Sequence, residues 1–170
     1  GTAPNNTTTF ASVFTSGQAM LYRAESVVYY VGRNNEGRPS LYRVRFSAEP
    51  NGVLTANPEE LVEGIENMQI LYGQDRVLTA SASPTGFIDG QNTAAAVEVS
   101  VTPSADAWRR VGAVQLGFVA ASPTRAASLQ ASASNASLMT MGVKYQAPSD
   151  GRYRSVYQTT IAVRNRLYGN

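Results

Sequence analysis

Residues 60–75 read ELVEGIENMQILYGQD, an acidic opening followed by an apolar segment that ends at Tyr72-Gly73. Asn57 and Pro58, just before it, have the residue types of a helix N-cap and first helical position, and glutamates follow them. Two periodicities fit the apolar residues: a helical one through Leu61, Ile65, Met68 and Tyr72, and an alternating one through Met68, Ile70 and Tyr72. Periodicity alone therefore leaves this stretch open between helix and strand.

The segment before this stretch predicts a β-hairpin. Val27–Val31 is β-branched and aromatic, a composition that suits a pleated surface. A turn cluster, Asn34–Gly37, separates it from Ser40–Phe46. In this second strand the apolar and the cationic side chains alternate, so we expect them on opposite faces: Tyr42, Val44 and Phe46 on one, Arg43 and Arg45 on the other.

The segments after this stretch predict further strands and one helical turn. Valines at 97, 99 and 101 alternate with polar residues, which indicates a half-buried strand that Pro103 ends. Ser104–Trp108 is expected to form a single helical turn, and the alternation of Val114, Leu116 and Phe118 predicts another strand. Two segments rich in small and polar residues are expected to be loops: Arg76–Asn92 and Pro123–Asn135.

A last hairpin is predicted near the end of the chain. It would pair Met141–Tyr145 with a strand at Tyr153–Arg166, around a turn at Pro148–Gly151. In the second strand one face would hold Tyr157, Thr159, Ile161 and Val163, and the other Arg154, Arg164 and Arg166.

Together these elements predict a mainly β fold, an antiparallel-sheet globular domain with short helical turns. We expect two packed sheets or one curled sheet. The 170 residues suit a single domain, 1–170, whose residues 1–18 are expected to be flexible. No run of about eighteen apolar residues and no signal peptide is present in the sequence given.

Composition excludes several kinds of chemistry within this chain. It contains no His and no Cys, which rules out Ser-His-Asp triads, Cys-His dyads, thiolates and imidazole zinc sites. Neither a GxGxxG turn nor a phosphate-binding GxxxxGK[ST] loop occurs. The net charge of +2 is too small to indicate a nucleic-acid footprint. We therefore expect no enzyme activity, no catalytic or cofactor-binding residues, no cofactor and no nucleic-acid partner.

The carboxylates are the remaining candidates for chemistry: Glu59, Glu60, Glu63, Glu66, Asp75, Asp89 and Asp106. We expect the glutamates to form a solvated first helical turn in favourable contact with the helix dipole. A metal site at a pair such as Asp75 and Asp89 is not expected, because Arg76 directly follows the first carboxylate.

The cationic and aromatic residues each allow two interpretations. After Asp150 the chain carries no acidic residue but four arginines: Arg152, Arg154, Arg164 and Arg166. They either attract acidic partners or DNA, or protect a solvent-facing strand by their charge, and we expect the second. Trp108 is expected to anchor the core rather than to stack on a ligand.

Three motifs occur in the order found in the PilW family of type IV pilus minor pilins, which the chain resembles. They are RPSLYRVRF at Arg38–Phe46, the acidic element at Glu60–Gly73, and RSVYQTTIAVRNRL at Arg154–Leu167. The resemblance is good over Glu25–Asp75 and looser over Ala105–Leu167. It favours a short helical turn that gives way to a strand over Asn67–Gly73. Many relatives carry an Asp/Gly-rich loop after the acidic element, which this chain lacks.

The resemblance implies an α+β pilin-like fold whose N-terminal membrane helix is missing here, so that the chain is a periplasmic globular domain. Its expected partners are other minor pilins, a tip adhesin and the major pilin filament. With them it would prime pilus assembly and form the tip complex, with a part in cell adhesion and twitching motility. It would be held at the inner membrane only through the missing helix, and later lie in the cell-surface pilus, or fimbrium. Two alternatives stay open: a minor pseudopilin of a type II secretion system, and a carbohydrate-binding β-domain whose tyrosines stack on sugars.

Overall fold

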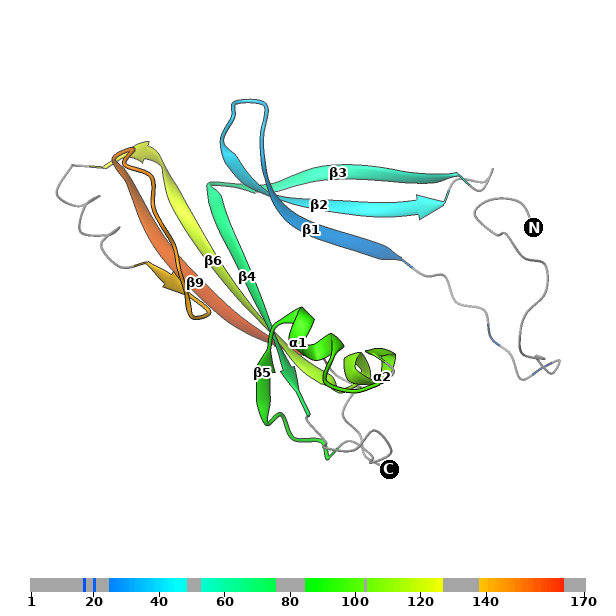
Figure 1. The fold of residues 1–170 in the computed structure, drawn as a ribbon. Coiled ribbons are helices and arrows are strands. Elements are labelled where there is room, and N and C mark those ends of the chain that lie inside the picture. Colours follow the sequence, from blue (N-terminus) through cyan, green and yellow to red (C-terminus); the bar gives the residue numbers. More distant parts are fainter. Residues whose placement is uncertain are drawn as a thin grey trace. The chain divides into compact units, whose positions relative to one another are not determined.

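The computed structural model describes residues 17, 20, 25–48, 53–75, 85–102, 104–126 and 138–163 (Figure 1). The chain divides into two compact units, Gly1–Glu63 and Gly64–Asn170, which are described separately below. The prediction of a single domain over 1–170 stays a prediction, as does the flexibility of residues 1–18, most of which lie outside the described residues.

The first unit contains a three-stranded antiparallel sheet with the order β1-β2-β3. Its strands are β1 (Ser26–Arg33), β2 (Pro39–Ala48) and β3 (Leu54–Glu63). The hairpin predicted from the sequence is confirmed, with β1 and β2 joined at Asn34–Gly37. Asn34 organises this turn because its Oδ1 accepts hydrogen bonds from the backbone N–H groups of Glu36 and Arg38.

The helix start predicted at Asn57 and Pro58 is wrong, because both residues lie in strand β3. They pair with β2, Asn57 opposite Arg45 and Pro58 opposite Val44. Proline is tolerated at this position because β3 is the outer strand of its sheet. Cross-strand pairing over ten residues thus outweighs the local capping signal.

The second unit is built on a four-stranded antiparallel sheet with the order β5-β4-β6-β9. Its strands are β4 (Ile65–Gln74), β5 (Gly90–Asn92), β6 (Val111–Arg125) and β9 (Arg152–Ala162). Strand β4 confirms the strand predicted over Asn67–Gly73, and β6 the strand predicted at Val114–Phe118. Of the predicted loop Arg76–Asn92, residues 85–89 have no regular structure and 90–92 form β5, while 76–84 lie outside the described residues.

Two short helices cover one end of this sheet: α1 (Ala94–Glu98) and α2 (Ser104–Arg109). The second confirms the helical turn predicted at Ser104–Trp108. The strand predicted for the valines at 97, 99 and 101 is wrong. Val97 and Val101, four residues apart, face the core, whereas the side chain of Val99 is 81% exposed. Thr93 caps α1 by accepting a hydrogen bond from the backbone N–H of Ala96.

The main hydrophobic core of the described residues lies under these helices. It consists of Val97, Val101, Ala107 and Val111, with Tyr72 and Trp108 packed against it. The two aromatic rings meet edge to face, with their centroids 5.0 Å apart. Trp108 thus contributes to the core, as predicted.

A small hairpin, β7 (Met139–Thr140) and β8 (Val143–Lys144), packs on the other face of the sheet. Its turn residues Met141 and Gly142 both have positive φ, 48° and 78°, as a tight two-residue turn requires. The predicted pairing of Met141–Tyr145 with the last strand is wrong, because β8 pairs with β7, and β9 pairs with β6. The second strand of that prediction is confirmed over Tyr153–Ala162.

The fold is mainly β, with antiparallel sheets and short helices, and this confirms the predicted fold class. The predicted loop Pro123–Asn135 begins within strand β6, whose last residue is Arg125, and its residues 127–135 lie outside the described part. In the described part of the chain, no helix is long and apolar enough to cross a membrane.

Candidate interaction surfaces and a buried polar cluster

Arg154 on β9 lies at the centre of a buried polar cluster. Its guanidinium donates from Nε and Nη2 to the two carboxylate oxygens of Glu66 on β4, at 2.6 and 2.8 Å. It also donates from Nη1 and Nη2 to Asp150, at 2.9 and 2.8 Å. Two carboxylates thus hold one guanidinium by paired, charge-assisted hydrogen bonds.

Tyr145 completes the cluster, because its hydroxyl donates to Glu66 Oε2 at 2.8 Å. Burial, followed by the nearby Glu66 carboxylate, raises the pKa of Tyr145 to about 12. The hydrogen bond from Arg154 lowers the pKa of Asp150 to about 2. The cluster ties strands β4 and β9 to residues 145–150. Arg152 also lies 3.7 Å from Asp150, so two arginines face the two carboxylates, which suits a structural role.

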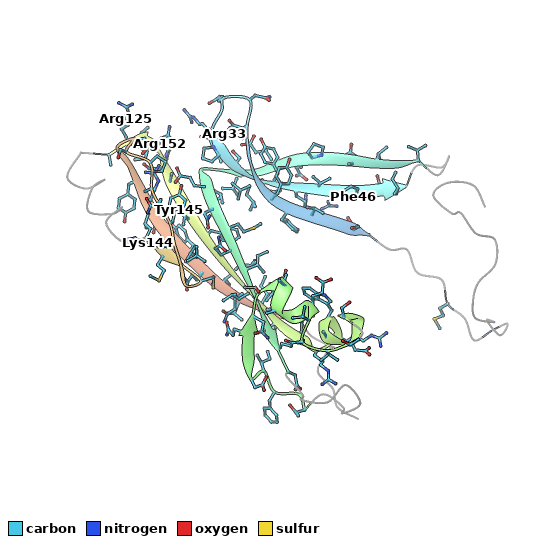
Figure 2. The ribbon with its side chains drawn as sticks, in the orientation of Figure 1. Arg33, Phe46, Arg125, Lys144, Tyr145 and Arg152 are labelled. Carbon is cyan, nitrogen blue, oxygen red and sulfur yellow. The ribbon has the colours of Figure 1, made fainter. Side chains whose placement is uncertain are left out.

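Two expectations about these residues are wrong. Arg154 was expected on a solvent-facing strand, but its side chain is fully buried. Glu66 was expected in a solvated helical turn, but it lies on a strand with 7% of its side chain exposed. Arg152 is partly buried, and Figure 2 shows it beside Arg125, its partner in the β6–β9 register. Arg164 and Arg166 lie outside the described residues.

Sequence reasoning missed Tyr145 and Asp150 as partners of Arg154. Figure 2 shows Tyr145 on the segment that runs beside β9, next to Lys144. The alternation of β9 placed Arg154 on the face opposite Tyr157, but it gave no signal that this end of the face is buried, because residues 157–162 are exposed on both faces.

Two glutamates of β3 pair with arginines, one in β2 and one just before it. Glu59 contacts Arg43 at 2.5 Å, and Glu63 contacts Arg38 at 2.6 Å. The hydrogen bond from Arg43 lowers the pKa of Glu59. Glu60 accepts a hydrogen bond from Asn34. The solvated helical turn expected for these carboxylates is therefore wrong, and they act as cross-strand partners instead.

The aspartates occupy three separate settings. Asp75 is buried, and its carboxylate accepts from Thr85 Oγ1 at 2.9 Å and from the backbone N–H of Gly86 at 2.7 Å. The backbone N–H of Asp89 donates a hydrogen bond to the backbone carbonyl of Gln74. Asp106 forms an ion pair with Arg109 in helix α2. Among the described residues, no three acidic side chains gather into a set that would hold a metal ion.

One face of the first sheet is mostly apolar. We call it the Val28 face. The strand register places the following side chains on it: Val28, Tyr30, Tyr42, Val44, Phe46, Ala56 and Pro58, and one carboxylate, Glu60, opposite Tyr42. Tyr30 and Tyr42 stack with their ring centroids 5.2 Å apart. The side chain of Val28 is 45% exposed, and that of Phe46, labelled in Figure 2, is also exposed.

The opposite face of this sheet is the more polar and charged one, although Tyr29, Val31, Leu41 and Val62 also lie on it. It carries the Arg43–Glu59 pair and Arg45, which contacts Glu25 at 3.6 Å. Val27 lies on this face, opposite Arg45, and is 38% exposed. The two faces therefore differ in chemistry, although neighbouring valines on β1 are similarly accessible.

The second sheet also has an apolar face, which α1 and α2 cover only at the Tyr72 end. Beyond the helices, the strand register places these side chains on it: Met68, Ile70, Leu116, Phe118, Tyr157 and Ile161. Those of β4 and β6 are partly buried, while Tyr157 and Ile161 on β9 are exposed. Apolar surface of this extent is typical of contact surfaces between proteins.

The model of a protein family described as type IV pilus-assembly protein W matches residues 28–165. The chain belongs to the PilW family. This match confirms the resemblance carried by the three motifs, and it extends over both compact units. PilW-family membership connects the chain with type IV pilus assembly, and with protein partners in the pilus machinery. No curated protein and no solved structure matches the chain.

Proposed function

We propose that this chain is a structural minor pilin that takes part in priming type IV pilus assembly and in forming the pilus tip complex. The PilW-family match over residues 28–165 carries the proposal. Its mechanism is contact between complementary protein surfaces rather than catalytic turnover. Its partners are other minor pilins, a tip adhesin and the major pilin filament.

The arrangement of the carboxylates supports a role without catalysis. Glu59, Glu63 and Glu66 each pair with an arginine, and Asp75 accepts hydrogen bonds from its own loop. A carboxylate that already pairs with an arginine or with its own loop is engaged within the fold, whereas a general acid or base has to reach the proton of a bound substrate. These side chains therefore suit the binding of strands to one another.

The apolar faces support the proposed contacts. The Val28 face holds valine, tyrosine and phenylalanine side chains and a single carboxylate, Glu60, and several of the apolar side chains are exposed. Aromatic side chains such as tyrosine and phenylalanine are enriched at protein interfaces, and tyrosine is frequent among the residues that contribute most to binding. We propose that other pilus subunits bind this face. Family resemblance further suggests attachment at the inner membrane through an apolar helix outside this chain, and later a place in the surface pilus.

Deletion of the parent gene tests the proposal when surface pili and exoprotein secretion are scored in the same strain. Loss of pili with intact secretion is the expected result, and complementation with the full-length gene should restore them. Loss of secretion with intact pili would instead indicate a minor pseudopilin of a type II secretion system. Unchanged pili and secretion would contradict both roles.

A further inference from the structure

The outer edge of strand β9 is open in the part of the chain that the structure describes. β9 is the last strand in the order β5-β4-β6-β9, and β6 pairs with its inner edge. Six consecutive residues, Tyr157–Ala162, are exposed. Tyr157 is 60% exposed and Ile161 50%, high values for large apolar side chains within a strand.

The backbone register shows which groups this edge offers. The N–H of Val163 donates to the carbonyl of Gly112 on the inner side of β9. Antiparallel strands alternate in the direction of their backbone groups, so the odd-numbered residues of β9 bond to β6. The N–H and C=O groups of Gln158 and Thr160 therefore point outward, ready to pair with another strand.

This edge lacks the features that usually prevent strand pairing. No charged residue, proline or glycine occurs between Ser155 and Val163. The outer strands of the first sheet differ in this respect. β3 contains Pro58 and three glutamates, and β1 contains Arg33 and follows Glu25 directly. β9 is thus the long outer strand with an unprotected edge.

We propose that the β9 edge binds the β9 edge of a second copy of this chain, in antiparallel orientation about Thr159. In this register Thr159 lies opposite itself, and Tyr157 lies opposite Ile161 of the copy. Gln158 and Thr160 exchange backbone hydrogen bonds with Thr160 and Gln158 of the copy. The two sheets then form one continuous sheet across a two-fold axis.

The side chains of β9 argue for a second copy as the occupant. Thr–Thr and aromatic–β-branched pairs are among the favourable cross-strand combinations, and the self-paired register supplies both. In the self-paired register, residues at equal distances on either side of Thr159 face each other, and the segment from Ser155 to Val163 carries no charge, so no like charges meet within it. This inference does not depend on the proposed function.

Sedimentation equilibrium of the chain over a wide concentration range tests the pairing. The unchanged chain should form dimers, and Thr159→Lys should weaken dimerisation at least about tenfold, because like charges would meet at the two-fold axis. Thr160→Pro should do the same, since it removes an outward N–H and leaves the bonds to β6 intact. Thr102→Lys, on an exposed loop residue, is the matched control and should dimerise normally. Circular dichroism and thermal unfolding of each variant check that the fold is retained.

Disulfide cross-linking tests the proposed register of the two β9 strands directly. The chain has no cysteine of its own, so a single introduced cysteine can link only to the copy. Facing residues in a non-hydrogen-bonded antiparallel pair have Cα atoms roughly 4.5 Å apart, within the range that a disulfide spans. Thr159→Cys should therefore cross-link rapidly on mild oxidation, and Thr102→Cys should not. A chain that stays monomeric at all concentrations, or cross-linking that is equally fast in both variants, would overturn the proposal.

Discussion

At the scale of single residues, Arg154 has the most demanding position in the second unit. Its guanidinium is fully buried, and Glu66 and Asp150 both contact it. A buried charge costs several kcal/mol of desolvation unless a partner compensates it. The cluster is therefore more sensitive to the loss of one member than the exposed ion pairs of the first sheet.

Replacing Arg154 should show this sensitivity. Arg154→Met leaves the Glu66 carboxylate buried without its cation, which should lower the free energy of unfolding by about 3 to 5 kcal/mol. Arg154→Lys keeps the charge but loses the paired hydrogen bonds of the guanidinium. Its free energy of unfolding should lie between those of Arg154→Met and the unchanged chain. Urea denaturation followed by circular dichroism measures both.

The matched control is Arg43→Met, which breaks the more exposed Arg43–Glu59 pair and should cost no more than about 1 kcal/mol. If Arg43→Met and Arg154→Met lower the free energy of unfolding equally, the buried cluster does not stabilise the chain more than the exposed pair.

Asp150 predicts a dependence of stability on pH. Its pKa is lowered to about 2 in the folded chain from an ordinary value of 3.8, so its contribution is present above pH 3.8 and is lost as pH falls towards 2. We expect Asp150 to contribute about 1 kcal/mol to the free energy of unfolding. This is less than its full pKa shift implies, because solvent screens a side chain that is 34% exposed. Asp150→Asn should remove this part of the pH dependence.

The free energy of unfolding of the unchanged chain and of Asp150→Asn should be measured between pH 2 and 5. This range of about three pH units covers the pKa of Asp150 in both the folded and the unfolded chain. Parallel curves for Asp150→Asn and the unchanged chain would contradict the account of this ion pair.

At the scale of elements, the sequence predicted strands with strong local alternation and failed where strand pairing overrides the local signals. The β1–β2 hairpin and strand β6 follow from β-branched alternation and turn residues alone. Asn57 and Pro58 have good local helix-start chemistry, yet pairing with β2 makes them part of a strand. The partner strand is close in sequence, but residues 54–59 show little apolar alternation that would have indicated a strand.

The strand predicted for the valines at 97, 99 and 101 was wrong for a different reason. Their alternation fits a strand, but a helical turn also places Val97 and Val101 on one side. The three alanines at 94–96 and the cap at Thr93 are the signals that favour α1. The buried cluster was hidden because its members are distant in sequence: Glu66 and Arg154 are 88 residues apart.

Gly117 on β6 governs how closely the β7–β8 hairpin packs on the sheet. A Cβ added there would overlap Thr140 Oγ1 and lie 2.9 Å from Met141 Cγ. Gly117→Ala should therefore destabilise the chain by about 1 to 3 kcal/mol, the usual range for overpacking. Thermal or urea unfolding measures the change.

A second substitution separates this clash from a general effect of alanine in the strand. Thr140→Ala removes the overlapping hydroxyl, so adding it to Gly117→Ala should recover part of the lost stability. Strictly additive effects of the two substitutions would contradict the packing explanation.

At the scale of the whole molecule, each compact unit presents an apolar sheet face, and the PilW family links the chain to pilus assembly. The family was predictable from three motifs of this chain, because those motifs lie in order along it. The faces themselves depend on strand register, which local patterns set only within the β1–β2 hairpin. We therefore propose that other pilus subunits bind the Val28 face.

Complementation of the deletion strain with two valine variants tests this claim most directly. Val28→Glu places a charge on the apolar face, and Val27→Glu places the same charge on the polar face one residue away, at a similarly exposed position. With both proteins folded and present at equal levels, we predict that Val28→Glu fails to restore surface pili and that Val27→Glu restores them. Normal piliation with Val28→Glu would contradict the claim.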